Sequence, residues 1–324
     1  MTHPPDKLPS FADLPVKPDA PPNSAWGLFG DHDQLGTLNL LTPERIAAAA
    51  TLVRKGAVFP LNLRIDCPEP PLYGRGAPRH TIIGEGGNSR DDYIDSFWPQ
   101  ASSQWDGLRH IRHHVHGFYN GVADDEIIPG DTGKLGMEHF ARKGIVGRGV
   151  LIDVAARMEA TRKSLDFMRS DRISVDLLKD CLREQNTEVE TGDILLIRTG
   201  WLNWYLESAT PVQKQQLADT SARREMEAPG IAPTTEMAAF LWDLHVSAVA
   251  ADNPALEAYP PATDDDFLHR TLIPLLGIPI GELWYLEDLS NDCAEDGVYE
   301  FMLTSAPLHM PGGVGSPPNA LAIK

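Results

Sequence analysis

Short apolar runs alternate with amphipathic segments along most of the chain, a pattern typical of an α/β protein. Apolar runs bounded by glycine or by turn residues predict buried strands at residues 149–154, 193–201 and 247–252. Helical periodicity predicts helices at residues 173–185, 234–246 and 266–277, the last one broken near Pro274. Further strands are expected at residues 58–66, 279–289 and 298–308. Together these elements predict one mixed sheet with helices packed around it.

The best-defined helix start is at residues 42–56. Thr42 suits the N-cap position, Pro43 suits the first helical position, and Gly56 provides a stop. Residues 68–107 are rich in Gly, Pro and acidic residues and are expected to form a long loop. A loop of this length in a compact domain is usually functional or acts as a lid.

The chain is expected to consist of two parts. Residues 1–24 are rich in Pro, Asp and Lys and predict an extended N-terminal arm, which a dimer partner could order. Residues 25–324 are expected to form a single domain, because the strand and helix patterns continue without a repeat or a low-complexity tract.

Charge and composition narrow the function classes. The formal net charge is −18 and 42% of the residues are hydrophobic, so the chain can form a large core under an acidic surface. Such a surface repels phosphate backbones and anionic lipids, which argues against nucleic-acid and membrane partners. A small anionic substrate remains compatible with it, because a local cationic site can still hold one.

Neither targeting signals nor cysteine patterns point outside the cytoplasm. The first residues lack a basic segment followed by an apolar run, and no stretch is long and apolar enough to span a membrane, so a cytoplasmic protein is expected. The three cysteines, Cys67, Cys181 and Cys293, are far apart in the sequence and form no CxxC motif. This argues against a disulfide framework and against a zinc ribbon.

Four of the eleven histidines lie in the stretch SQWDGLRHIRHHVH, residues 103–116. Asp106 and His110 are four positions apart, and on a strand His114 and His116 would share a face opposite to His113. Two local metal-binding groups are therefore open: Asp106 with Gln104 and His110, or His110 with His114 and His116. Either group is also compatible with ordinary surface polar residues.

The C-terminal half contains further candidate residues. Glu282 lies in an apolar, strand-like segment, where a carboxylate needs a ligand or a partner, and a salt bridge to an arginine is the alternative. His269 precedes it in a helical segment. Asp252 ends the strand predicted at 247–252, a position where functional groups often lie, or it caps the turn that comes next. The chain has no P-loop, dinucleotide-binding, GxSxG or HExxH motif.

Over most of its length the chain resembles the metal-dependent "putative cyclase" family, which includes bacterial kynurenine formamidases, isatin hydrolases and trans-dienelactone hydrolase. It is most similar to the longer branch of that family. The family implies a swivelling β/β/α fold, barrel-like and wrapped by helices, and a homodimer or homotetramer. The resemblance rests on these stretches: WGLFGDHDQLGTLNLLTPE, SQWDGLRH, FYNG, GIVGRGVLIDV, TGDILLIRTGW, AADNPALEAYPP, LHRTLIPLLGIPIGELWYLEDL and LTSAPLHMPGGVGSPPNALAI.

The family signature HxGTHxDxPxH aligns with this chain at Asp106 and His110. Its two earlier histidines fall on Gln100 and Gln104, Ser103 takes the place of its Thr, and Leu108 that of its Pro. A glutamine oxygen is a poor zinc ligand and suits manganese better.

The distal metal ligands of the family fall on His269 and Glu282. The resemblance therefore implies one divalent metal ion, manganese or zinc, instead of two. Asp106, His269 and Glu282 would hold it, with Gln104 as a fourth or supporting ligand. His110 matches the catalytic histidine of the family, which acts as general base.

A small-molecule pocket usually has an aromatic wall, and the substrate-binding residues expected here are Trp105, Tyr119, Asn120, His116 and Trp284. Core packing is the alternative role of the aromatic residues. The expected function is hydrolysis of an amide or lactone bond in a small cyclic or N-acyl substrate. Two alternatives remain: a cyclase, dehydratase or isomerase with the same site, or a family member that has lost catalysis and only binds a ligand.

Overall fold

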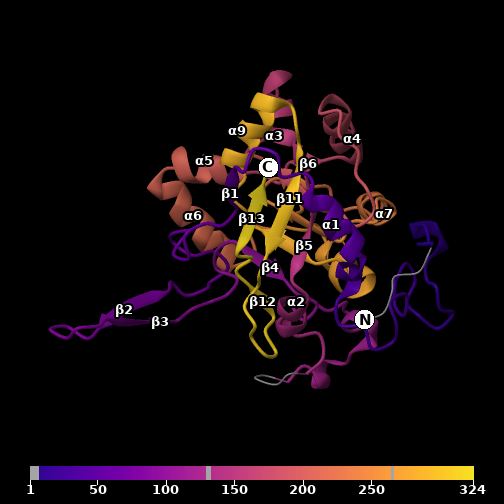
Figure 1. Ribbon diagram of the computed structural model, residues 1–324, viewed down its shortest axis with the longest axis horizontal. Coiled ribbons are helices and arrows are strands. Elements are labelled where there is room, and N and C mark those ends of the chain that lie inside the picture. Colours follow the sequence, from indigo (N-terminus) through magenta and orange to yellow (C-terminus); the bar gives the residue numbers. More distant parts are fainter. Residues whose placement is uncertain (1–6, 129–132, 264–265) are drawn as a thin grey trace.

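One mixed sheet, strongly curled into a half-barrel, forms the centre of the computed structural model, which describes residues 7–128, 133–263 and 266–324 (Figure 1). Its strand order is β1-β13-β11-β5-β7-β9-β10-β4-β12. In that order the strands are Val58–Pro60, Ala320–Ile323, Glu300–Ser305, Ile145–Asp153, Ile194–Arg198, Ala248–Ala251, Ile280–Glu282, Gln104–Asp106 and Gly315–Ser316. The fold class expected from the sequence, a barrel-like mixed sheet surrounded by helices, is confirmed.

Strands β5, β7, β9 and β10 run parallel to one another and form the buried middle of the sheet. Every residue of β9 and β10 is buried, and so is all of β7 except Arg198. Parallel strands covered on both faces are continuous apolar runs, which explains why the sequence located β5, β7 and β9. Two bounds differ, because β5 begins earlier, at Ile145, and β7 ends at Arg198, before the predicted residue 201. Strand β4 lies antiparallel to β10 at one side of this group.

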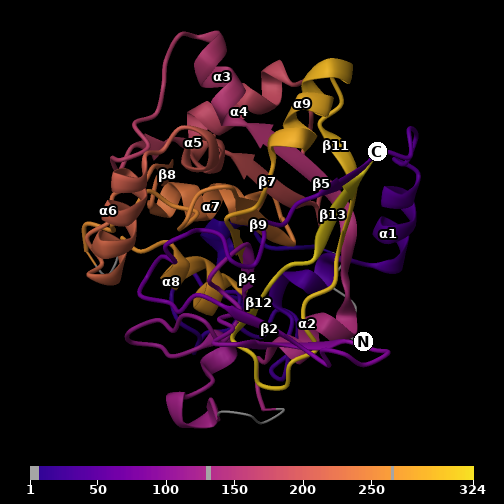
Figure 2. The same ribbon diagram turned by 90° about the vertical axis from the view of Figure 1, so that its left-hand side faces the viewer.

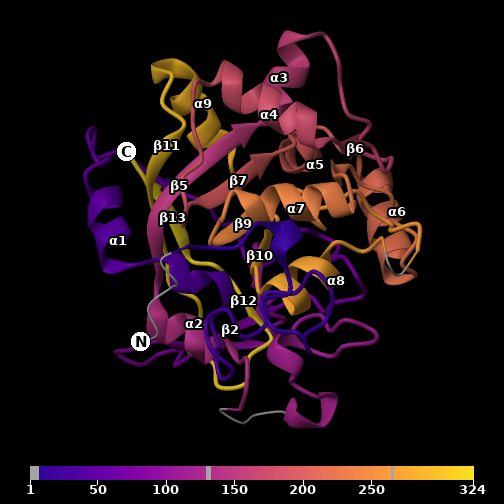
Figure 3. The ribbon, with the colours of Figure 1, turned by 90° about the vertical axis from the view of Figure 1, so that its right-hand side faces the viewer.

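Helices surround the sheet, as the two views at right angles to Figure 1 show (Figures 2 and 3). Helix α1 packs against β5 and β11, α4 also packs against β5, and α3 packs against β7. The helices α1 to α9 are Pro43–Ala50, Met137–Lys143, Val154–Ala160, Val175–Glu184, Trp201–Glu207, Pro211–Ala222, Thr235–Asp243, His269–Thr271 and Glu287–Asp296.

Helix α1 begins where the sequence predicted and ends earlier. The Thr42 hydroxyl caps it by accepting a hydrogen bond from the Arg45 amide at 3.4 Å, and Pro43 is its first residue. It ends at Ala50, well before Gly56. The helix expected at residues 266–277 is also different: α8 is a single turn that continues as the π-helical turn Leu272–Leu276, with Pro274 inside it.

Three other expectations need correction. Residues 68–107 are not one loop, because β2 (Arg79–Ile83) and β3 (Asp91–Asp95) pair as a hairpin that projects from the body of the molecule (Figure 1). Both strands are largely exposed, so they lack the apolar alternation that marks a strand in sequence. The strand at 58–66 stops at Pro60. The segment at 279–289 leaves strand geometry after Glu282, because Leu283 has φ 56°, and α9 begins at Glu287.

The described part of the N-terminal segment lies against helix α7 of its own chain. The Phe11 amide donates to Asp243 Oδ1 at 2.6 Å, and the Trp242 indole donates to the Pro9 carbonyl at 3.0 Å. Residues 1–6 of the expected arm lie outside the described residues. Among the described helices, none has the length and apolar character needed to cross a bilayer.

Candidate metal centre

The pairing of β4 with β10 brings the acidic groups of the site to one face of the sheet. Glu282 lies opposite Gln104 in the register, and Ile280 lies opposite Asp106. Because side chains alternate along a strand, Gln104 and Asp106 share a face and Trp105 points to the other. This alternation places a carboxylate from each strand at the same point.

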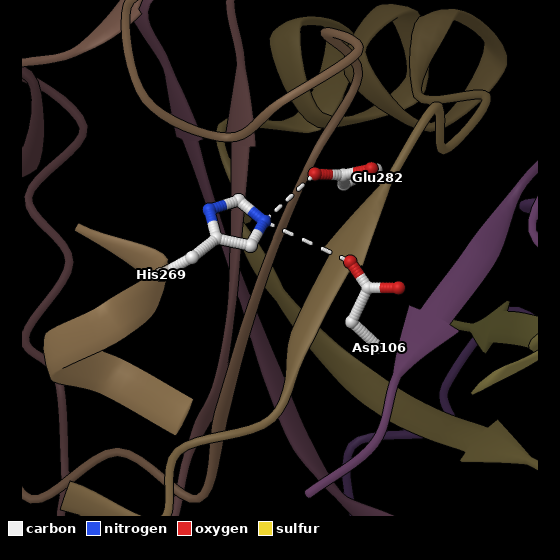
Figure 4. A group of neighbouring side chains, drawn as sticks. All are labelled: Asp106, His269 and Glu282. Atoms are coloured by element: carbon white, nitrogen blue, oxygen red, sulfur yellow. Dashed lines mark hydrogen bonds and ion pairs between the residues drawn. The ribbon is translucent and has the colours of Figure 1, made fainter. Parts of the chain in front are cut away.

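Helix α8 supplies an imidazole to this point. His269 Nε2 lies 3.0 Å from Glu282 Oε1 and 3.7 Å from Asp106 Oδ2 (Figure 4). All three side chains are buried, and their facing atoms lie within 4.8 Å of one another. Within the described ranges this is the one such group of three.

The three facing atoms fit a divalent cation. Ligand atoms about 2.0–2.2 Å from a tetrahedral zinc ion lie roughly 3.3–3.6 Å apart, close to the separations found here. Asp106 Oδ2 is buried and accepts no hydrogen bond from the described residues, which is costly for a carboxylate oxygen unless a cation contacts it. Two carboxylate oxygens and one imidazole nitrogen form a donor set suited to manganese or zinc.

Neighbouring residues hold His269 and Glu282 in place. They contact the atoms of these two side chains that face away from the proposed metal position. Glu257 contacts His269 Nδ1 through both carboxylate oxygens, at 2.9 and 2.8 Å. The Gln104 amide donates to Glu282 Oε2. Each contact leaves one atom of the supported side chain, His269 Nε2 or Glu282 Oε1, facing the common point.

Gln100 supports Asp106, the third of these side chains, and it also contacts His110. Its amide nitrogen donates to Asp106 Oδ1 and lies 2.9 Å from His110 Nδ1. On its other side, His110 Nε2 is 3.7 Å from Asp106 Oδ2. Gln104 and Gln100 therefore each orient a neighbouring carboxylate, Glu282 and Asp106.

The site has an excess of buried negative charge. Burial and, after it, the charge of Asp106 raise the pKa of Glu282 to about 7, although His269 and Arg75 lower it in part. Burial also opposes ionisation of Asp106, but the positive charges of His110 and His269 outweigh it, so the pKa of Asp106 is lowered. Burial disfavours the charged form of His269, yet Glu257, Asp106 and Glu282 together raise its pKa well above the usual range. Three carboxylates thus surround one imidazole, and a divalent cation would balance them.

A cavity of about 610 Å³ opens beside this centre. His110, His269 and Glu282 line it, together with arginine, tyrosine, proline and phenylalanine side chains from other elements. None of the five residues expected to bind substrate is among the described residues that line it: Trp105, Tyr119, Asn120, His116 and Trp284.

Those residues lie in the core or in adjoining loops. Trp105 and Trp284 pack edge to face with ring centres 4.7 Å apart, and the Trp284 indole donates to the Gln104 carbonyl at 3.0 Å. Tyr119 is buried with its hydroxyl 3.2 Å from Asp33, and Asn120 bonds the backbone of Gly27 and Gly30. The two tryptophans support β4 from the face opposite to Asp106.

The trailing histidines form a tight loop, not a strand. The His113 ring stacks on those of His114 and His116, each at 4.6 Å, and His113 Nδ1 accepts hydrogen bonds from the amides of Val115 and His116. The expected alternation of faces is therefore wrong. His110 faces Asp106 instead of joining His114 and His116.

Asp252 contacts the end of β7 instead of the turn that follows it. It accepts hydrogen bonds from the Thr199 amide and hydroxyl, both at 2.7 Å, and from the Gly200 amide at 2.8 Å. It therefore joins the end of β9 to the end of β7. Glu282 pairs with His269 and Gln104, and no arginine among the described residues forms a salt bridge with it.

Three residues of this region were not singled out from the sequence: Glu257, Gln100 and Arg75. Glu257 lies in the family-like stretch AADNPALEAYPP, where it follows the apolar Ala255 and Leu256, and an acid in such surroundings was a usable signal. Gln100 was aligned with a lost histidine but given no role. Arg75, which donates to the Gln100 carbonyl and to Gln104 Oε1, lies in a Gly- and Pro-rich segment without a recognisable pattern.

Comparison with known proteins agrees with this architecture. The family model described as "Putative cyclase" matches residues 39–258. A crystal structure described as a novel cyclase shares 36% identity and a TM-score of 0.80, covering 93% of this chain and 99% of its own. A search of curated proteins found no match.

Two isatin hydrolases share the fold at lower identity. The enzyme from Ralstonia solanacearum is 18% identical with a TM-score of 0.58, covering 88% of this chain and 99% of its own. The enzyme from Labrenzia aggregata, bound to benzyl benzoate, is 16% identical with a TM-score of 0.55, covering 85% and 94%. On the strength of the family model and the 36% identical structure, the chain belongs to the cyclase family.

Proposed function

We propose that the protein is a metal-dependent hydrolase of an amide or lactone bond in a small cyclic or N-acyl substrate. The observation that carries the proposal is Asp106 Oδ2, a buried carboxylate oxygen that faces His269 and Glu282 beside a cavity and that no described residue hydrogen-bonds. Membership of the cyclase family supports it, and the names of the isatin hydrolases point to hydrolysis within this fold.

Asp106 Oδ2, Glu282 Oε1 and His269 Nε2 would hold the metal ion, manganese or zinc. When bound, such an ion polarises a carbonyl oxygen and lowers the pKa of a water molecule. Gln104 keeps Glu282 in place with its amide nitrogen, while its oxygen is turned toward Arg75. In this arrangement Gln104 supports the ligands and is not itself one.

His110 is the general base. It lines the cavity, Gln100 contacts its Nδ1, and its Nε2 lies on the side of Asp106 Oδ2. Burial lowers the pKa of His110 more than the Asp106 charge raises it, so the imidazole is neutral near pH 7 and able to accept a proton. It takes the proton from the attacking water and returns it to the leaving nitrogen or oxygen.

The test is a panel of lactones, lactams and N-formyl amines, assayed with protein treated with a chelator and then reloaded with manganese or zinc. The proposal expects no hydrolysis by the stripped protein and recovery with at least one metal. Full activity of the stripped protein would contradict the mechanism. Failure of every loaded sample to hydrolyse any compound would favour a cyclase, dehydratase or isomerase reaction in the same site.

A further inference from the structure

We propose that the ligand of this cavity carries a carboxylate on a flat ring, and that Arg224 and Arg270 recognise that carboxylate. The inference rests on the proposed function and adds the class of substrate to it. It follows from the chemistry of the cavity walls.

One part of the wall is aromatic. Phe267 stacks on His269 with ring centres 4.6 Å apart and an interplanar angle of 7°. Tyr73 and Tyr259 meet edge to face at 6.0 Å, and both line the cavity. Flat walls of this kind favour a flat ring, because aromatic groups stack or meet edge to face at these distances.

The charges of the wall are mostly positive. Among the described residues that line the cavity, Arg75, Arg224 and Arg270 carry positive charge, and Glu282 is the one carboxylate. Glu282 already pairs with His269 and Gln104. In a protein with a formal net charge of −18, three arginines that line one cavity are a local concentration of positive charge that can attract an anion.

The three arginines have different surroundings. The Arg75 guanidinium donates to the Gln100 carbonyl and to Gln104 Oε1, and it lies 5.0 Å over the Tyr73 ring. Arg75 is thus part of the support of the two glutamines. Arg270 follows His269 directly in the chain and is half-buried.

Arg224 is exposed and follows helix α6. Its charge acts on the Tyr259 phenol, since it opposes the rise in pKa that burial causes there. An arginine at the exposed side of the cavity and a second beside His269 can hold a carboxylate through charge-assisted hydrogen bonds.

The test is isothermal titration calorimetry of the full chain with benzoate and benzamide, which match in ring and size and differ in charge. Both ligands are titrated into chelator-treated protein and into manganese-loaded protein. Benzoate is expected to bind about ten-fold more tightly than benzamide in both samples. A difference of this size is typical of one hydrogen bond between charged groups. Arg224→Gln and Arg270→Gln should each remove much of this preference and leave benzamide binding unchanged.

Arg223→Gln is the matched control, because Arg223 is adjacent in sequence, pairs with Glu225 at 2.8 Å and does not line this cavity. Equal affinity for the two ligands would overturn the inference. So would a preference that needs manganese and survives the double variant Arg224→Gln/Arg270→Gln, because the metal alone would then hold the carboxylate.

The outcomes also separate this inference from the proposed function. If benzoate binds as expected but loaded protein hydrolyses nothing in the panel, the proposed function fails and the anion site stands. If loaded protein hydrolyses N-formylaniline and 2-(formylamino)benzoate with equal kcat/KM, the proposed function stands and the anion site fails.

Discussion

Glu257 holds the ring of His269 through both carboxylate oxygens, each within 2.9 Å of Nδ1, while a third contact joins Glu257 to the His269 amide at 3.2 Å. Because Nδ1 is occupied on that side, Nε2 is the nitrogen that faces Asp106 and Glu282. A carboxylate behind a histidine is the usual way in which proteins orient a metal-binding imidazole and increase its basicity.

Replacing Glu257 with Gln should weaken metal binding while the fold persists. The amide keeps the volume and one hydrogen bond, but it removes the charge that orients the imidazole. The expected loss of metal affinity is about 10- to 100-fold, measured by competition with a chelator. Glu227→Gln, which removes an exposed ion pair with Arg169, is the control and should bind metal as the wild type does. Unchanged affinity in Glu257→Gln would rule out this supporting role.

Replacing His110 with Ala should strongly reduce turnover and leave metal content intact. Loss of a general base lowers kcat by about 10²- to 10⁴-fold, and His110 is not one of the three side chains that converge on the metal point. Steady-state assays measure kcat, and elemental analysis of the same sample measures its metal content. His114→Ala is the control, since His114 is exposed and does not line the cavity. Retention of wild-type kcat in His110→Ala would assign the base to another group.

Asp252 gives a prediction about stability and pH. Burial raises the pKa of Asp252 to about 6, although hydrogen bonds from Thr199 and Gly200 lower it in part. The folded state therefore binds a proton more tightly than the unfolded state does. This contribution to stability is complete below pH about 4, the pKa of an unfolded Asp, and it is lost as the pH rises through 6.

The variant Asp252→Asn should lack the loss of stability that ionisation of Asp252 causes as the pH rises. From pH 4 to pH 6, the free energy of unfolding of the wild type should fall relative to the variant by up to about 1.4 kcal/mol per pH unit. Urea unfolding at several pH values measures the difference, and groups common to both proteins cancel. Parallel pH profiles would show that Asp252 is ionised across this range.

The buried middle of the sheet could be predicted from sequence because each strand carries its own signal. Residues 247–252, for example, form an apolar run that ends in an acid, and β9 occupies Ala248–Ala251. The β2–β3 hairpin could not be predicted in this way, because it is exposed on both faces and no burial imposes a pattern on it. The end of β10 at Glu282 could not be predicted either, because the next residue, Leu283, has a φ of 56° that its side chain does not indicate.

For the candidate site, sequence reasoning named the three side chains that converge but not the residues that orient them. Asp106, His269 and Glu282 were found through a family resemblance, and carboxylates and histidines are recognisable types of metal ligand. Glu257 contacts His269 only because the fold brings the two residues together, and no sequence spacing identifies Glu257 as the partner of that histidine. The aromatic residues expected at the cavity lie in the core. The sequence could not show this, because hydrophobicity alone does not distinguish a pocket wall from core packing.

The most direct test of the central claim is the metal content of purified protein after loading with manganese or zinc and removal of unbound ion. The account predicts one ion per wild-type chain and a Tm that rises with metal concentration, as binding to the folded state requires. It also predicts that His269→Ala and Asp106→Asn, each shown to be folded by circular dichroism, take up no ion and show no rise in Tm. A wild-type chain that takes up no ion, or folded variants that still bind one, would contradict a metal centre at Asp106, His269 and Glu282.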